Sequence, residues 1–249
     1  DTDSLLADEG DLWAFVSDNA NFNDYYDFVP KSTQTVSGRF VKVPKNIATG
    51  LDTDGSELNA GDVGFPLPPN DGSWQRDLRS VAPLGIDGPQ WVLEYWSQLN
   101  NVFQFVRVED IAYDKRPGME NVVYLIDSGA GSAGGPSPTI STNGRIWRMV
   151  LDKNDPTIVQ SLSVMVNGDD KATSAVDPAG ARGEIRQPDN LDTTVNGSML
   201  VTEDPGSRQQ FAATSVDPNR TTARVWQVTL PPANYDPLTA PYDGLTKRV

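Results

Sequence analysis

The sequence predicts an all-β fold of the β-propeller class, on the strength of two observations. Short apolar runs rich in Val, Tyr, Trp and Phe alternate with Asp, Asn, Gly and Pro, and long helical periodicity is missing. Such alternation is typical of strands joined by turns. The strands also recur as an internal repeat, in which a polar-fronted strand, an acid-ended strand and an Arg-led strand follow one another. Repeats of this kind indicate propeller blades, and we expect five or six of them in the full protein.

The strands expected in chain order are separated by polar turns. They are Leu12–Ser17, Arg39–Val43, Gln90–Trp96, Val122–Ile126, Arg145–Leu151, Ser161–Val166, Ser198–Thr202 and Arg224–Leu230. A single short helix is expected within Trp74–Ser80. Residues 1–249 are expected to form one propeller domain or part of one, with long inserted loops near 46–72 and 168–183.

The repeat is defined by how its strands begin and end. The acid-ended strand recurs at Ser17-Asp18, Asp127-Ser128 and Glu203-Asp204, and the Arg-led strands begin at Arg39, Arg145 and Arg224. Two copies also have a front strand, Arg107–Ile111 and Gln187–Leu191. Propellers usually need at least four blades to close. We therefore expect this chain to be part of a larger propeller, unless Ser80–Phe105 forms a divergent blade.

The composition excludes several kinds of chemistry. Cysteine and histidine are both absent. Disulfides, thiolate nucleophiles and Cys-ligated metals are thereby excluded, as are the Ser-His-Asp triad and most transition-metal sites within the chain. Catalysis would have to use carboxylates, Lys, Arg, Tyr, hydroxyl groups or metals bound by oxygen. No apolar stretch approaches the roughly 18 residues that span a bilayer, so no transmembrane segment is expected.

The charge of the chain indicates which partners to expect. The 34 acidic and 20 basic residues give a formal net charge of −14. Nucleic acids and anionic membrane surfaces are disfavoured because both require a basic face. An excess of Asp and Glu favours hard cations such as Ca²⁺, and a solvated acidic surface is the alternative interpretation.

The front strands are the first candidate site, because the innermost strands of propeller blades face a common channel. Arg107 and Glu109 share one face of their strand, and Asp189 occupies the matching place in the next repeat. Carboxylates that converge there repel one another unless a cation lies between them. The predicted metal ligands are Glu109, Asp110, Asp127, Asp189, Asn190 and Glu203. The alternative is that these acids cap turns or pair with Arg107, Arg145 and Arg224.

Two other polar segments have simpler interpretations. Asp52–Glu57 alternates acids around a Gly, as the first half of an EF-hand loop does, but a polar surface turn explains it as well. Asn196-Gly197 has the sequence of a tight hairpin turn.

Four stretches of the chain resemble the PhoX-type alkaline phosphatase family of bacterial secreted propellers. They are Phe105–Asp110, Val123–Gly129, Gly144–Arg148, and Pro188–Leu191 followed by Leu200–Asp204. The resemblance implies phosphate-ester hydrolysis with Ca²⁺ and Fe³⁺ bound at the channel. It further implies that Arg107 contacts the phosphate, that Glu109 binds metal, and that Asp189, Asn190 and Glu203 lie near the metals. The iron centre of the family uses a cysteine, which would have to come from outside this sequence.

The sequence therefore leaves two main hypotheses. The first is a metal-dependent phosphoesterase of the PhoX type with Arg107 and Glu109 as its catalytic residues. It would be secreted, periplasmic or at the cell surface, and its substrate would be a small-molecule phosphate ester. The second is a non-catalytic, Ca²⁺-stabilised propeller that serves as an extracellular binding or structural module. A lactonase-like hydrolase is a third reading without a motif of its own. The remaining part of the same propeller is a further expected partner.

Overall fold

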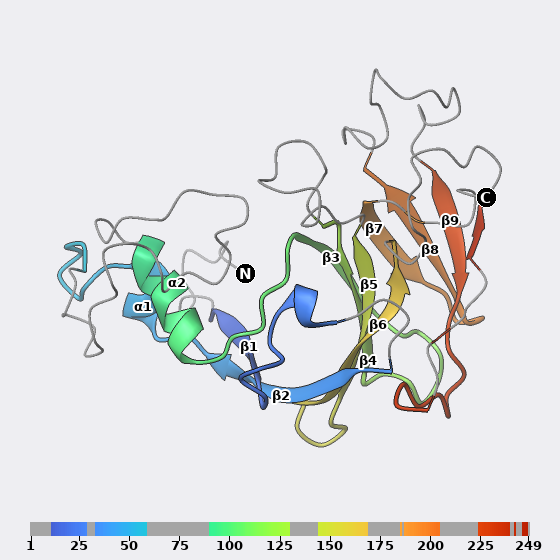
Figure 1. Cartoon of the computed structure of the whole chain (residues 1–249), viewed down its shortest axis with the longest axis horizontal. Helices are drawn as coiled ribbons and strands as arrows, with labels where there is room; N and C mark the ends of the chain where they lie inside the picture. The colour runs from blue at the N-terminus through green and yellow to red at the C-terminus, as the bar shows by residue number, and fades with distance from the viewer. Residues whose placement is uncertain are drawn as a thin grey trace. The chain divides into compact units, whose positions relative to one another are not determined.

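The fold is known from a computed structural model (Figure 1), which describes residues 11–28, 33–58, 90–129, 144–168, 185, 187–204, 224–239, 242 and 246–248. The contacts divide the chain into two compact units. The first contains residues 1–23 and 38–103, and the second contains residues 24–37 and 104–249. The expected helix within Trp74–Ser80 and most of both expected inserted loops lie outside the described residues.

The first unit combines a hairpin with two helices. Strand β1 (Trp13–Ser17) pairs antiparallel with β2 (Thr35–Lys42), and Phe15 lies opposite Phe40. Helix α1 (Lys45–Thr49) and helix α2 (Gln90–Leu99) follow along the chain. The apolar core of the unit is made of Val43, Ile47, Leu58, Val92 and Tyr95. None of the described helices is long and apolar enough to cross a membrane.

The strand predicted at Gln90–Trp96 is wrong, because this segment forms helix α2. Its β-branched and aromatic residues suggested a strand. Val92 and Tyr95 are nevertheless spaced three residues apart, as on one helical face, and both are buried. Leu93, Glu94 and Gln98 are good helix formers, and the Gln98 amide lies 3.4 Å from the Glu94 carboxylate one turn earlier. This part of Ser80–Phe105 is therefore not a divergent blade.

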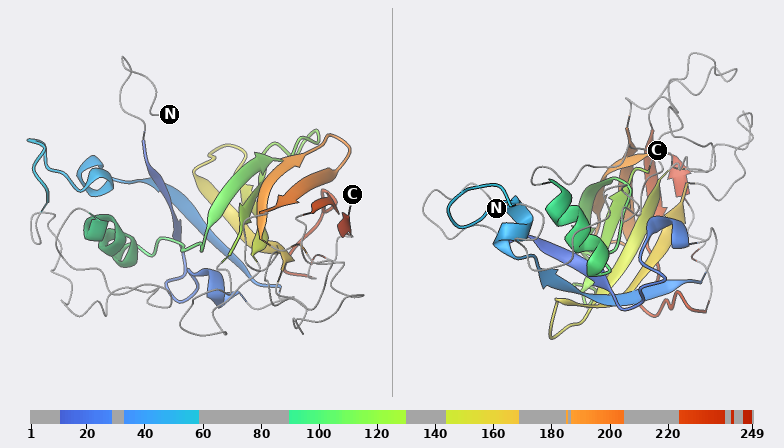
Figure 2. Two further views of the ribbon diagram at one scale, coloured as in Figure 1. Left: turned by 90° about the horizontal axis from the view of Figure 1, so that it is seen from above. Right: turned by 60° about the vertical axis from the view of Figure 1, so that its left-hand side comes forward.

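The second unit contains two groups of four antiparallel strands, each running in chain order (Figures 1 and 2). The first group is β3 (Val108–Tyr113), β4 (Val122–Asp127), β5 (Arg145–Leu151) and β6 (Ile158–Asn167). The second group is β7 (Pro188–Thr193), β8 (Ser198–Glu203), β9 (Val225–Thr229) and β10 (Thr246–Arg248). A one-turn helix, η1 (Tyr25–Asp27), belongs to the same unit. The predicted fold class is confirmed: the described part of the chain is mostly β, in one six-stranded and one four-stranded antiparallel sheet, consistent with an incomplete β-propeller.

The register of the strands confirms the internal repeat in the second unit. Trp147 lies opposite Leu125 in the first sheet, and Trp226 lies opposite Val201 at the equivalent place in the second sheet. Both front strands, β3 and β7, have an irregularity at the same position, after Val108 and after Pro188. Glu109 and Asp189 are therefore equivalent residues of successive repeats.

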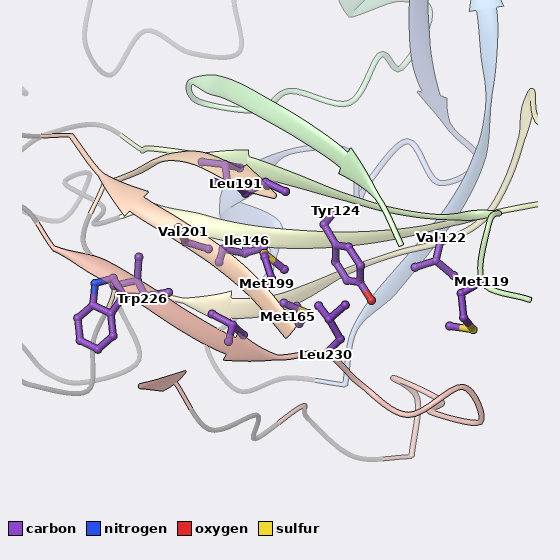
Figure 3. Close-up of a cluster of buried hydrophobic side chains, with 13 residues drawn as sticks. Met119, Val122, Tyr124, Ile146, Met165, Leu191, Met199, Val201, Trp226 and Leu230 are labelled. Atoms are coloured by element: carbon purple, nitrogen blue, oxygen red, sulfur yellow. The ribbon is translucent and has the colours of Figure 1, made fainter. Parts of the chain in front are cut away.

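The main core lies between the two sheets of the second unit (Figure 3). Tyr124, Ile146 and Met165 come from the first sheet, and Leu191, Met199, Val201 and Trp226 come from the second. The other face of β5 contains Arg145 and Trp147. The Arg145 guanidinium donates to the backbone oxygens of Tyr25 and Phe28 and lies 3.8 Å from the centre of the Tyr25 ring. Trp147 makes edge contacts with the rings of Tyr25, Phe28 and Phe105.

Candidate functional site

The two front strands are the end strands of their sheets, and polar side chains link one to the other. The Asp110 carboxylate accepts a hydrogen bond of 2.9 Å from the backbone N–H of Leu191. The Thr193 hydroxyl donates to the backbone oxygen of Tyr113 at 2.6 Å, and the Lys115 ammonium pairs with Asp192 at 2.5 Å. Three links along the two edges hold β3 beside β7, which fixes the relative positions of their polar residues.

A group of polar side chains, four of them charged, lies near the beginning of these strands. We call it the front-strand cluster: Arg107, Glu109, Asp189, Asn190 and Asp204. Arg107 Nη2 lies 2.8 Å from Glu109 Oε1 and 4.0 Å from Asp204 Oδ2. Burial raises the pKa of Asp189, and the negative charges of Glu109 and Asp204 raise it further. The Asn190 amide donates to Asp189 at 2.6 Å. The structure thus brings together four of the residues that the sequence singled out, with Asp204 in addition.

Asp204 is a member of the cluster that the prediction passed over in favour of its neighbour Glu203. Alternation along a strand sends adjacent side chains to opposite sides, so only one of the two acids can face the cluster. Comparison with the preceding repeat shows that Asp204 is the acid that faces the cluster. The backbone N–H of Asp204 bonds to the Gln187 oxygen at 2.9 Å, as that of Ser128 bonds to the Arg107 oxygen at 2.9 Å. Ser128 is therefore the equivalent residue, and its hydroxyl donates to Glu109 at 2.9 Å.

Asp127 and Glu203 end equivalent strands, and both are buried. The Asp127 carboxylate accepts from the backbone N–H groups of Val106, Arg107 and Gly129 at 2.7, 2.9 and 2.9 Å. Burial raises its pKa in spite of these bonds. Glu203 accepts from the backbone N–H of Arg224 at 3.0 Å and from the Trp226 indole at 2.9 Å. Both acids thus anchor the loops around the strand ends.

Asp110 also uses its carboxylate for backbone contacts. One oxygen accepts from Leu191, as described, and the other accepts from its own neighbour Ile111 at 2.8 Å. Asp110, Asp127 and Glu203 were all predicted as metal ligands on the basis of their places in the repeat. In the structure, their oxygens are hydrogen-bonded to backbone or indole N–H groups, which leaves the front-strand cluster as the candidate site.

The charges of the cluster determine what it can bind. Three carboxylates and one guanidinium lie in the cluster, so acids outnumber the base among the described residues. This excess suits a hard cation, which would also lower the pKa of Asp189. The positions fit less well: among the described residues, no three Asp or Glu side chains are grouped closely enough to form a metal centre. The cluster as it stands is a mixed-charge site with an exposed guanidinium.

The segment Asp52–Glu57 forms a surface turn. The backbone of Asp52 bonds to Ser56 at 2.8 Å, and the Asp54 carboxylate accepts from the hydroxyl of Ser56 at 2.6 Å. Asp54 thus closes its own turn, in agreement with the simpler of the two interpretations. Asn196-Gly197 forms the predicted hairpin turn between β7 and β8, where Gly197 adopts a φ of 80°.

Comparison with known proteins finds little. No protein-family model matches the chain, and no curated protein matches it. One solved structure that resembles it is that of Pseudomonas fluorescens PhoX in complex with vanadate, a transition state analogue. The two chains are 14% identical with a TM-score of 0.42, and the match covers 95% of this chain but only 35% of that chain. This chain therefore spans about a third of the length of the PhoX structure.

Proposed function

We propose that this chain is the substrate-binding part of a metal-dependent phosphoesterase, and that the front-strand cluster binds a small phosphate ester together with a divalent cation. The observation that supports the proposal is that a guanidinium and three carboxylates lie close together where β3 lies beside β7. Arg107 provides a fork for an anion, and Glu109, Asp189 and Asp204 provide oxygen atoms for a cation.

Arg107 is suited to phosphate because the guanidinium presents several N–H donors in one plane, which match two phosphate oxygens. Its side chain is 48% exposed, and its partner Glu109 is 27% exposed, so a ligand has access to both. A phosphate that displaces Glu109 from Arg107 would free the Glu109 carboxylate to face a cation. The Ser128 hydroxyl, which donates to Glu109, would hold that carboxylate in place.

The proposed cation is Ca²⁺, because every available donor is an oxygen atom. Such an ion, when bound, polarises a phosphoryl oxygen and offsets the charge of the transition state. The remaining ligands would come from outside the described residues or from another part of the propeller. Fe³⁺ is a weaker candidate, since a cysteine ligand would have to come from elsewhere. A location outside the cytoplasm, as the sequence suggested, belongs to the same proposal.

The test measures hydrolysis of an aryl phosphate by the whole chain, with Ca²⁺ and with a chelator. Ca²⁺ should support turnover, and Glu109→Gln should lower kcat/KM at least 100-fold, because a carboxylate that faces cation and substrate is lost. Asp192→Asn is the matched control, since Asp192 lies on β7 but pairs with Lys115 outside the cluster. Turnover that is unchanged in Glu109→Gln would exclude this site.

A non-catalytic Ca²⁺-binding module is the second candidate, and one observation favours it. The carboxylates of the front-strand cluster outnumber its guanidinium, and a cation alone offsets this excess without any substrate. The same samples distinguish the two functions. Ca²⁺ that raises the unfolding temperature of the chain, but not that of Glu109→Gln, without hydrolysis in either, would identify a binding module.

A further inference from the structure

Arg148 is a buried arginine on the face of β5 that packs between the two sheets. Its side chain is 4% exposed, and it lies opposite Tyr124 on β4 and Ser163 on β6. Its neighbour on that face, Ile146, belongs to the apolar core. The Nε atom of Arg148 has no hydrogen-bond partner, and none of the described carboxylates forms an ion pair with its guanidinium.

Five other polar side chains lie near Arg148 and are linked to it in turn by ring contacts, hydrogen bonds and charge. Its guanidinium carbon lies 5.6 Å from the centre of the Tyr235 ring, and that ring packs edge-on against Tyr242 at 5.6 Å. The positive charge of Arg116 lowers the pKa of Tyr242 against the larger effect of burial. Arg116 pairs with Asp114 at 2.6 Å, and the Tyr124 hydroxyl, next to Arg148, donates to Asp114 at 3.0 Å. We call Asp114, Arg116, Tyr124, Arg148, Tyr235 and Tyr242 the tyrosine–arginine ring.

The charges of the ring do not balance. Arg116 holds the Asp114 carboxylate through two bonds, Nε to Oδ1 at 2.9 Å and Nη2 to Oδ2 at 2.6 Å. Arg148 is therefore left as an additional positive charge. The phenols do not compensate for it. Burial raises the pKa values of Tyr124, Tyr235 and Tyr242, that of Tyr242 to about 12, so all three stay neutral.

An uncompensated guanidinium inside a protein is strongly unfavourable, and arginine does not escape by losing its proton. A burial of this kind is tolerated when an anion satisfies the charge and the free N–H groups. We propose that the tyrosine–arginine ring is a binding site for a small oxyanion, a phosphate or a carboxylate, with Arg148 as its principal ligand. The hydroxyl of Tyr124 donates to Asp114, and that of Tyr242 donates to the backbone oxygen of Thr229, so the anion would depend mainly on the guanidinium.

This site differs from the front-strand cluster. Asp114 follows the end of β3, whereas Arg107 precedes its start, so the two groups lie at opposite ends of the strand. The ring has one carboxylate and two guanidiniums, so basic groups outnumber acidic ones. In the cluster, acidic groups outnumber the single basic one. It therefore suits an anion without a cation, and its existence does not depend on the proposed phosphoesterase activity.

The experiment measures thermal unfolding of the whole chain and of Arg148→Met at fixed ionic strength, with 10 mM inorganic phosphate, with 10 mM malonate, and without either. One or both anions should raise the unfolding temperature of the parent by several degrees, in the manner of a ligand that binds the folded state alone. Arg148→Met should lose this rise. Without anions it should unfold at the same temperature as the parent or higher, because a buried charge has been replaced by an apolar chain of similar length.

Arg107→Met is the control that separates the two sites. It should keep an anion-dependent rise, which then belongs to Arg148 and not to the front-strand cluster. A parent that does not respond to either anion would overturn the proposal, and so would a rise that persists in Arg148→Met. Arg148→Met that is less stable than the parent in anion-free buffer would also overturn it, because the charge would then be balanced by the chain itself. The anion that gives the larger rise in unfolding temperature identifies the class of ligand, phosphate or carboxylate.

Discussion

At the scale of single residues, Asp189 shows how crowding of charge affects a folded protein. Burial and the charges of Glu109 and Asp204 raise its pKa. The fold therefore favours the protonated form, and the stability that this acid contributes at low pH is lost as the pH rises through its folded pKa. A cation bound at the front-strand cluster would reverse this balance.

Asp189→Asn should therefore stabilise the protein at pH 7 in the presence of a chelator, by less than about 1 kcal/mol because the group is partly solvated. At pH 3 the two proteins should be equally stable, since the carboxyl group of the parent is then protonated. Urea unfolding at both pH values measures the difference. With Ca²⁺ at pH 7 the parent should gain more than the variant. Destabilisation by the variant at pH 7 without Ca²⁺ would show that crowding at Asp189 is outweighed by its contacts.

Asp114 represents the opposite case. Burial disfavours its charge, but hydrogen bonds from Arg116 and Tyr124 and the charge of Arg116 outweigh that effect, so its pKa is lowered. A lowered pKa contributes stability above the pKa of the unfolded chain, near 4, and that stability is lost as the pH falls through the folded pKa.

Asp114→Asn should lower the free energy of unfolding at pH 7 by about 3 kcal/mol, because the Arg116 guanidinium loses its partner. The difference from the parent should shrink as the pH falls below about 4. Denaturant unfolding between pH 3 and pH 7 gives the comparison, and Asp192→Asn is the control. Asp192 is 66% exposed in its pair with Lys115, so that change should cost no more than about 0.5 kcal/mol. Equal losses for the two variants would contradict the buried role of Asp114.

The sequence was informative about which residues are equivalent and less so about which way they face. Equivalence identified Glu109 with Asp189 and Asp127 with Glu203, and the register confirms both pairs. An acid at the end of a strand can either face a channel or accept hydrogen bonds from the backbone. The residue is Asp or Glu in both cases, so its identity does not show which role it has. Arg148 was missed for a related reason. It stands between Trp147 and Met149, and only the partner strands determine that it points into the core.

At the scale of elements, Gly144 shows how β5 begins. It adopts a φ of 88°, and a Cβ atom placed there would lie 2.5 Å from the backbone oxygen of Asp127 and 2.8 Å from the Pro188 ring. The acid-ended strand and the next front strand therefore meet at this glycine. Both the backbone angle and the lack of space exclude a side chain.

Gly144→Ala should destabilise the protein by at least about 3 kcal/mol, since both strain and steric overlap arise. Gly118→Ala separates the two effects, because Gly118 has a φ of 82° with nothing within 4 Å of its Cβ position. That variant should lose only about 1 kcal/mol, the usual cost of a left-handed conformation for alanine. Chemical denaturation of both variants tests this, and similar losses would argue against the close approach at Gly144.

Element types were predictable where strand pattern and turn residues agreed, as they do from β3 to β9. They were not predictable at α2, where aromatic content and periodicity disagreed. Val92 and Tyr95 have helical spacing, but Trp91 and Trp96 beside them extend the apolar run and obscure it. The three-residue spacing of the buried residues determines that this segment is a helix, because a helix of this kind buries only one of its faces.

At the scale of the whole molecule, the formal net charge of −14 has a measurable effect. Repulsion among exposed acids opposes the compact state and is screened by salt, with a Debye length that falls from about 30 Å at 0.01 M to about 10 Å at 0.1 M.

The unfolding temperature should accordingly rise as NaCl increases from 0.01 to 0.2 M and change little beyond that range. Calorimetric scans in a buffer without divalent cations or phosphate measure the effect. Asp189→Asn should show a smaller rise, because one of the repelling charges is absent. An unfolding temperature that falls with added salt would mean that ion pairs such as Lys42–Asp11 and Lys115–Asp192 outweigh repulsion.

The acids on the front strands have one more consequence, which concerns association between molecules. β3 and β7 are end strands, and unpaired backbone groups on such strands can recruit a strand from another chain. Asp110 occupies the N–H of Leu191, and Glu109, Asp189 and Asp192 place like charges along the same two edges. An incoming strand would have to displace a carboxylate and approach others. The side chains that make this region a candidate site thereby also protect the protein against edge-to-edge aggregation.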